Sequence, residues 1–138
     1  RIPVDAAAEG ARYAVEPALL ETLVETYGRR YREVLDRTLE RPDLKARLCP
    51  SNPNIVAELA HAVEAEAAVS LTDVLLRRTG IGTSPCLGRD CAEGIATRMA
   101  GLCGWDRARQ ERELAAFWDE VELGQRFREA EAGGEKKA

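Results

Sequence analysis

The sequence predicts an all-α fold, a single domain of about five helices with orthogonal or bundle-like packing. Apolar residues recur at spacings of three and four along several stretches, as on one face of a helix. Alternating apolar and polar runs are absent, and β-branched runs are few, which argues against a sheet. At 138 residues the chain can bury one core without metal or disulfide staples, so one domain is expected.

Composition and charge exclude several classes of protein. The net charge is −4, and basic residues are interleaved with acidic ones, so no basic face for nucleic acid is expected. No apolar run approaches the roughly 20 residues that span a bilayer, and the N-terminus lacks a signal-peptide pattern. We therefore expect a soluble protein with no transmembrane segment. The chain starts at Arg1 without an initiator Met, which predicts a fragment of a longer protein.

The chain divides into three parts by its apolar pattern. Residues 1–16 lack periodicity and predict a linker or tail, residues 17–123 a helical domain, and residues 124–138 a helix end and a disordered tail. Pro17 suits a first helical position. The first helical face is formed by Leu20, Leu23, Val24, Tyr27, Tyr31, Val34 and Leu35. Because this spacing continues through Gly28, a continuous or gently broken element is expected there.

Two prolines after Cys49 interrupt the pattern, and a short helical turn is expected before them, within residues 40–48. Asn52 or Asn54 is then expected to cap a helix. The buried stripe of that helix is predicted to comprise Ile55, Leu59, Ala62, Val63 and Ala67. Ser70, three residues before Asp73, predicts a new helix or a kink.

Residues 80–88 predict an irregular connection, and two helices follow it. The first is expected to begin at Asp90 and to end at Gly104, and Asp106 is expected to cap the last helix. Their apolar faces comprise Ala92, Ile95, Ala96, Met99, Leu102 and Cys103, and then Leu114, Phe117, Trp118 and Val121. The pattern fades after Gly124.

The Glu58-x-x-His61 spacing can offer two metal ligands on one side of a helix, as in carboxylate-bridged di-iron bundles. Such a site requires a second pair, and His61 is the only histidine of the chain. A polar helix flank with a half-exposed His61 is therefore the preferred interpretation.

The four cysteines are expected to be reduced thiols, in keeping with a cytosolic compartment. As an alternative, Cys86, Cys91 and Cys103 could supply three zinc ligands, with Cys49 or His61 as the fourth. Against it, there is no C-x-x-C pair, and Cys103 lies on an apolar face. Whether Cys86 and Cys91 bind a metal or pair with each other stays open.

Two adjacent arginines end the helix that contains Asp73. Asp73 and Arg77 are four residues apart, which favours an intrahelical ion pair. Arg78 is predicted to make a bidentate bond to Glu66 or Glu58 across a helix pair. The alternative is that the arginines bind a phosphate or an acidic surface. Gly80-Ile81-Gly82 lacks a preceding strand and a later glycine, so no dinucleotide-binding loop is expected.

Several of these motifs together resemble the C-terminal helical domain of FAD-dependent glycerol-3-phosphate dehydrogenases and the related oxidases. The resemblance covers roughly residues 17–122, with an acidic-flanked helix running into a D-V-L-x-R-R-T element and a later Gly-Trp before the last helix. The matching positions, which transfer as a structural signature, are Glu58, Glu66, Asp73, Arg77, Arg78 and Trp105. No catalytic, cofactor-binding or metal-binding residue transfers.

The resemblance implies a parent enzyme that oxidises sn-glycerol 3-phosphate to dihydroxyacetone phosphate. FAD would be bound by the parent and not by this fragment, and the fragment's partner would be the flavin-binding and substrate domain of the same polypeptide. A cytoplasmic location is implied, with peripheral membrane association and a homo-oligomeric parent left open. The alternatives are a freestanding helical protein-interaction module and, less favoured, a cysteine-based zinc or redox protein.

Overall fold

The computed structural model describes residues 3–65 and 70–137. Within these residues the chain forms six α-helices, one two-stranded sheet and four short 3-10 or π segments. The helices are α1 (Ala6–Tyr13), α2 (Pro17–Tyr27), α3 (Tyr31–Glu40), α4 (Val56–Glu64), α5 (Ala92–Cys103) and α6 (Arg107–Lys137). The other elements are β1 (Arg47–Cys49), β2 (Asn52–Ile55), η1 (Gly28–Arg30), η2 (Pro42–Lys45), η3 (Asp73–Arg78) and η4 (Ile81–Thr83). The predicted, predominantly helical fold is confirmed. The expectation that no sheet forms is wrong, because β1 and β2 form a hairpin.

Helix α1 lies where the sequence predicted a linker or tail. Asp5 caps it by accepting a hydrogen bond from the Ala8 amide at 3.1 Å. Tyr13 is 2% exposed and Glu9 is 6% exposed, so the helix is packed into the core. The helical fold therefore begins before Pro17, and the linker assignment of this segment is wrong.

The chain turns sharply between α2 and α3. Gly28 has φ +58° and ψ −135°, a backbone conformation that residues with a Cβ rarely adopt. The short 3-10 helix η1 begins at this residue. The predicted helical face is buried on both sides of the break, from Leu20 in α2 to Leu35 in α3. The apolar spacing was thus correct, but two helices replace the continuous or gently broken element.

The hairpin β1–β2 replaces the helix start predicted at Asn52 or Asn54. Arg47 pairs with Ile55 and Cys49 with Asn52, with an irregularity between them. The Arg47 guanidinium donates to the Asn52 carbonyl oxygen at 2.6 and 3.1 Å, which holds the two strands together across the turn. Because the backbone stays extended through Ile55, α4 begins only at Val56.

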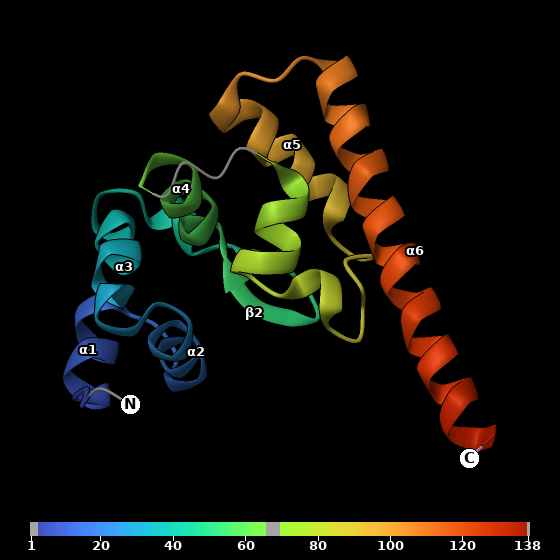
Figure 1. Cartoon of the computed structure of the whole chain (residues 1–138). Helices are drawn as coiled ribbons and strands as arrows, with labels where there is room; N and C mark the ends of the chain where they lie inside the picture. The colour runs from blue at the N-terminus through green and yellow to red at the C-terminus, as the bar shows by residue number, and fades with distance from the viewer. Residues whose placement is uncertain (1–2, 66–69, 138) are drawn as a thin grey trace.

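Helix α4 occupies the centre of the fold and contacts α3, α5, β2, η2 and η3 (Figure 1). Every residue from Val56 to Ala62 is buried, so α4 is covered on all sides instead of along one stripe. Alanines at 57, 60 and 62 allow its neighbours to approach closely. Glu66 and Ala67, which the sequence also assigned to this region, lie outside the described residues.

Element η4 and the connection from it to α5 pack against Phe117 of α6. The Phe117 side chain is fully buried. A Cβ at Gly82 would lie 2.9 Å from the Phe117 ring, and one at Gly88 would also lie 2.9 Å from it. The two glycines therefore allow the ring to sit against the loop. Asp90, predicted to cap α5, accepts a hydrogen bond from Ser51 at 2.7 Å instead.

Helix α6 begins as predicted but is longer than expected. The Asp106 side chain accepts the Arg109 amide at 2.7 Å, and Gly104 ends α5 with φ +71°, which confirms both boundaries. Instead of fading at Gly124, the helix continues to Lys137 and extends away from the other helices (Figure 1). Within the described part of the chain, each helix is too short or too polar to cross a bilayer.

Candidate functional site

Glu58, in the first turn of α4, is a core carboxyl group that is 1% exposed. Its Oε2 accepts the Ile55 amide at 2.7 Å, as a glutamate in the third helical position does when it reaches back to the helix start. Its Oε1 accepts the Tyr27 hydroxyl at 3.0 Å and the Asn54 side-chain amide at 3.1 Å. Glu58 thereby joins α2, β2 and α4.

The three groups that donate to Glu58 are all neutral. Burial raises the pKa of Glu58 above its ordinary value, and the hydrogen bonds from the Ile55 amide, Asn54 and Tyr27 only partly offset this effect. The Glu58 carboxyl group therefore holds its proton more strongly in the folded protein than it would in water.

His61, one turn further along α4, was predicted to be half exposed, and that prediction is wrong. It is 1% exposed, and its ring lies edge-on to that of Tyr27 with 5.7 Å between ring centroids. Among the described residues, the cluster that brings three metal-ligating groups together contains neither Glu58 nor His61. Both side chains contact Tyr27 and thereby link α4 to the end of α2.

Asp73 organises the helical segment that starts after Ser70. Its backbone amide donates to the Ser70 hydroxyl at 3.0 Å, which confirms the predicted cap. Its carboxylate lies 3.6 Å from the Arg77 guanidinium and 3.3 Å from that of Arg78. The predicted Asp73 to Arg77 pair is thus present, although Arg77 is 81% exposed and solvent weakens the attraction.

The predicted fork from Arg78 to Glu58 is wrong, because the Glu58 oxygens accept from the neutral donors described above. Glu66, the other predicted partner of Arg78, lies outside the described residues.

Trp105 lies half buried between α5 and α6. The Arg109 guanidinium lies 5.2 Å from the centroid of the Trp105 ring, a cation–π distance. The Nε of Arg109 also donates to Glu113 at 3.2 Å. Glu113 in turn accepts the Leu71 amide at 2.8 Å. Trp105 is therefore one end of a chain of contacts that ties α6 to the start of the η3 helix, and sequence reasoning did not identify Glu113 as part of it.

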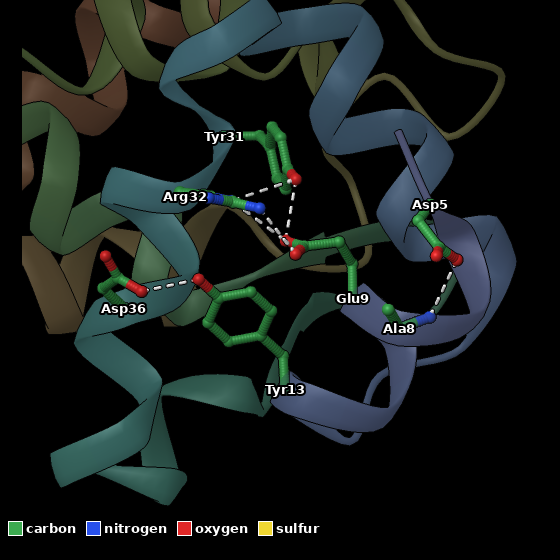
Figure 2. A network of polar contacts seen from close by, with 7 residues as sticks. All are labelled: Asp5, Ala8, Glu9, Tyr13, Tyr31, Arg32 and Asp36. Atoms are coloured by element: carbon green, nitrogen blue, oxygen red, sulfur yellow. Dashed lines mark hydrogen bonds and ion pairs between the residues drawn. The ribbon is translucent and has the colours of Figure 1, made fainter. Parts of the chain in front are cut away.

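A second polar network, which the sequence did not predict, joins α1 to α3 (Figure 2). Glu9 accepts the Tyr31 hydroxyl at 2.7 Å, and the Arg32 guanidinium donates to both of its oxygens at 2.8 and 3.2 Å. The Tyr13 hydroxyl donates to Asp36 at 2.5 Å. The one available sequence signal was the helix-capping Asp5 before an alanine-rich run.

These contacts shift the pKa of Glu9 and of the two tyrosines in the network. Hydrogen bonds from Tyr31 and then Arg32 hold the pKa of Glu9 below its ordinary value. Burial, followed by the hydrogen bond to Asp36, raises the pKa of Tyr13 to about 12. Glu9 is therefore stabilised as a carboxylate, opposite to Glu58.

Three of the four cysteines form a cluster. The sulfur atoms of Cys49, Cys86 and Cys91 all lie within 4.8 Å of one another. Within the described residues this cluster includes neither Cys103 nor His61, which the sequence had also considered as ligands. Cys103 lies at the other end of α5.

The family model for the C-terminal domain of alpha-glycerophosphate oxidase matches residues 5–110. The chain belongs to this family. Among curated proteins it is 32% identical over 114 residues to glycerol-3-phosphate dehydrogenase 2 of Mycobacterium tuberculosis, covering 82% of the chain and 20% of that protein.

Two further relatives extend the comparison. The glycerol-3-phosphate dehydrogenase of a Synechocystis species is 31% identical over 97 residues, 70% of the chain and 18% of that protein. That of Mycobacterium leprae is 31% identical over 113 residues, 81% of the chain and 19% of that protein. The chain thus spans about a fifth of the length of these relatives. No solved structure matches the chain.

The alpha-glycerophosphate oxidase C-terminal domain matched here extends from just before α1 into the first turn of α6. It therefore includes the α1 segment that the sequence assigned to a linker, and it starts earlier than the resemblance suggested. Most of α6 lies beyond the matched residues.

Proposed function

We propose that this chain is the C-terminal, non-catalytic helical domain of an FAD-dependent glycerol-3-phosphate dehydrogenase, packed against the flavin-containing part of the same polypeptide. The parent would be a cytoplasmic enzyme that oxidises sn-glycerol 3-phosphate to dihydroxyacetone phosphate. The family match over residues 5–110 carries this proposal, together with relatives of which the chain covers about a fifth.

A structural role for the signature positions is supported by what their side chains contact. Glu58 holds three neutral donors in the core, and Asp73 holds two arginines of its own helical segment. Trp105 is engaged by Arg109. These side chains are occupied in contacts within the fold, so we assign the chemistry of the parent to its remaining part.

The flavin would also be held outside this chain. Gly80-Ile81-Gly82 is the segment that most resembles a glycine-rich phosphate-binding loop. The π segment η3, and not a strand, precedes it. A Cβ at Gly82 would lie 2.6 Å from Leu76 and 2.9 Å from Phe117, so protein side chains fill the space beside it. This pair does not fit a pyrophosphate.

The test separates the domain from its parent. The chain purified alone should show no flavin absorption after incubation with FAD and no oxidation of sn-glycerol 3-phosphate, whereas the full-length parent should show both. Added to the parent's flavin-containing part expressed without this domain, it should co-elute with that part on size exclusion. A yellow preparation of the chain alone would refute the non-catalytic assignment, and separate elution would refute the proposed packing.

One observation favours the alternative of a freestanding interaction module. On the far part of α6, Leu123 is 46% exposed and Phe127 is 66% exposed, as on a helix that binds a partner. The coding sequence upstream of Arg1 distinguishes the two. A G-x-G-x-x-G unit between a predicted strand and helix supports the dehydrogenase domain, and its absence supports the module.

A further inference from the structure

The thiols of Cys49, Cys86 and Cys91 reach one point from three segments of the chain. Cys49 ends β1, Cys86 lies in the loop between η4 and α5, and Cys91 directly precedes α5. Cys49 and Cys91 are buried, and Cys86 is half buried. The cluster therefore has two members in the core and one member that solvent can reach.

The distances between the sulfur atoms fit ligands of one ion. Thiolates bound to zinc at about 2.3 Å in tetrahedral geometry lie about 3.8 Å from one another. The sulfur atoms of Cys49 and Cys86 are 3.7 Å apart, and the third lies within 4.8 Å of both. A disulfide requires about 2.05 Å between two sulfurs and leaves a third thiol without a role.

Amide groups donate hydrogen bonds to the sulfurs of Cys49 and Cys86. The Gly88 amide, two residues after Cys86, donates to its sulfur at 3.4 Å, and the Asn52 side-chain amide lies 3.2 Å from the Cys49 sulfur and 3.5 Å from that of Cys86. The Ser84 hydroxyl also lies 3.4 Å from the Cys86 sulfur, but it donates its proton to the Ile81 carbonyl oxygen at 2.6 Å. Amide donors of this kind orient thiolate ligands and disperse their charge.

The loop that carries Cys86 is fixed in place. Leu87 and Gly88 both have positive φ, +54° and +79°, which turns the Gly88 amide back toward the sulfur. The Phe117 ring packs on Gly88, where an added Cβ would lie 2.9 Å from it. The loop therefore presents Cys86 to Cys49 and Cys91 through a preformed turn.

We propose that Cys49, Cys86 and Cys91 form a binding site for a thiophilic divalent cation such as Zn²⁺, with the fourth position open to solvent beside Cys86. On binding, the three thiols release their protons to solvent and coordinate as thiolates. The ion would then join the hairpin to α5 and its preceding loop, in addition to the parent's proposed chemistry and independently of it.

The proposal is tested on the reduced, chelator-treated protein by titration with Co²⁺ and then Zn²⁺. We expect one equivalent of Co²⁺ to give the intense visible bands of tetrahedral sulfur coordination together with sulfur-to-metal charge transfer, and Zn²⁺ to displace it. Zn²⁺ should also raise the melting temperature, because it binds the folded state. Cys86→Ser should weaken Zn²⁺ binding by about a hundredfold or more, and Asn52→Ala by about tenfold.

Cys103→Ser is the matched control, because Cys103 is also half buried but lies outside the cluster. It should leave the affinity unchanged. In the unmodified chain, Zn²⁺ should slow alkylation of Cys86 and not of Cys103, a comparison that needs no variant to fold. Equal affinity of Cys86→Ser and the starting protein would overturn the proposal, as would absence of the Co²⁺ bands in the reduced protein.

Discussion

Glu9 in α1 and Glu58 in α4 are carboxyl groups of similar exposure, 6% and 1%, and each accepts a hydrogen bond from a tyrosine of another helix. Their remaining partners differ. Glu9 also meets the Arg32 guanidinium, whereas among the described residues the further partners of Glu58 are an amide side chain and a backbone amide. The pKa of Glu9 is lowered and that of Glu58 is raised.

The difference separates two ways of holding helices together with a buried acid. At Glu9 the hydrogen bond from the Tyr31 hydroxyl, and then those from the Arg32 guanidinium, stabilise the carboxylate, and Arg32 keeps much of its own surface in water. At Glu58 the loss of hydration exceeds what three neutral donors return, so the proton is retained more strongly. The first arrangement combines a phenol with a cationic hydrogen-bond donor, and the second depends on neutral donors in the core.

The largest effect is expected from Glu58→Ala. This change leaves the Tyr27 hydroxyl, the Asn54 amide and the Ile55 amide without their acceptor and opens a cavity, so the free energy of unfolding should fall by about 3 kcal/mol. Glu58→Gln keeps the volume and one carbonyl acceptor, and it should cost less than half as much. Urea unfolding at pH 7 measures both. Equal losses would show that the charge of Glu58, and not its acceptor role, matters.

The comparison also shows what the sequence could predict. Local signals gave reliable boundaries: Asp106 caps α6, Gly104 ends α5 and Ser70 caps the segment before η3. Each depends on residues within three or four positions. Apolar spacing likewise predicted that Met99 and Phe117 are buried, but it was wrong for Leu102, which is 36% exposed.

Contacts between distant residues account for the failures. The hairpin depends on Arg47 reaching the Asn52 carbonyl, and nothing in the helix-capping pattern at Asn52 reveals that competing bond. The burial of His61 depends on Tyr27 of another helix. The approach of Cys49 to Cys86 and Cys91 depends on the fold of the intervening chain, so the sequence could nominate ligands but not select the correct three.

A smaller effect is expected from Glu9→Ala, because one of its partners remains hydrated. The buried Tyr31 hydroxyl loses its acceptor, and the free energy of unfolding should fall by about 1 to 2 kcal/mol. Tyr31→Phe removes the donor instead of the acceptor and should cost about 1 kcal/mol. Thermal or urea unfolding measures the two changes. If Glu9→Ala were as costly as Glu58→Ala, the distinction between charge-supported and fully desolvated acids would not hold.

Glu58 and Glu9 should each contribute to the free energy of unfolding in a different pH range. Because the pKa of Glu58 is raised on folding, its contribution is complete below about pH 4.5 and is lost as pH rises through its folded pKa. Because the pKa of Glu9 is lowered, its contribution is present above about pH 4.5 and is lost as pH falls through its folded pKa.

Glu58→Gln cannot ionise, so its stability relative to the starting protein should improve as pH rises above 4.5, by at most about 1.4 kcal/mol per pH unit. The free energy of unfolding that Glu9→Gln loses relative to the starting protein should become smaller only below pH 4.5. Urea unfolding between pH 3.5 and 8 provides both difference curves. Parallel curves for Glu58→Gln and the starting protein would contradict the raised pKa.

Asp73 provides an intermediate case, since its side chain is 21% exposed and has two arginine neighbours. Arg78 is 30% exposed and Arg77 is 81% exposed, so the same charge meets different degrees of solvent screening. Arg78→Ala should lower the free energy of unfolding by about 0.5 to 1 kcal/mol, and Arg77→Ala by less than about 0.5 kcal/mol. Melting temperatures of the two variants compare them directly. If Arg78→Ala left the melting temperature unchanged, its charge would be available for a phosphate or an acidic surface, and Asp73 would resemble neither Glu9 nor Glu58.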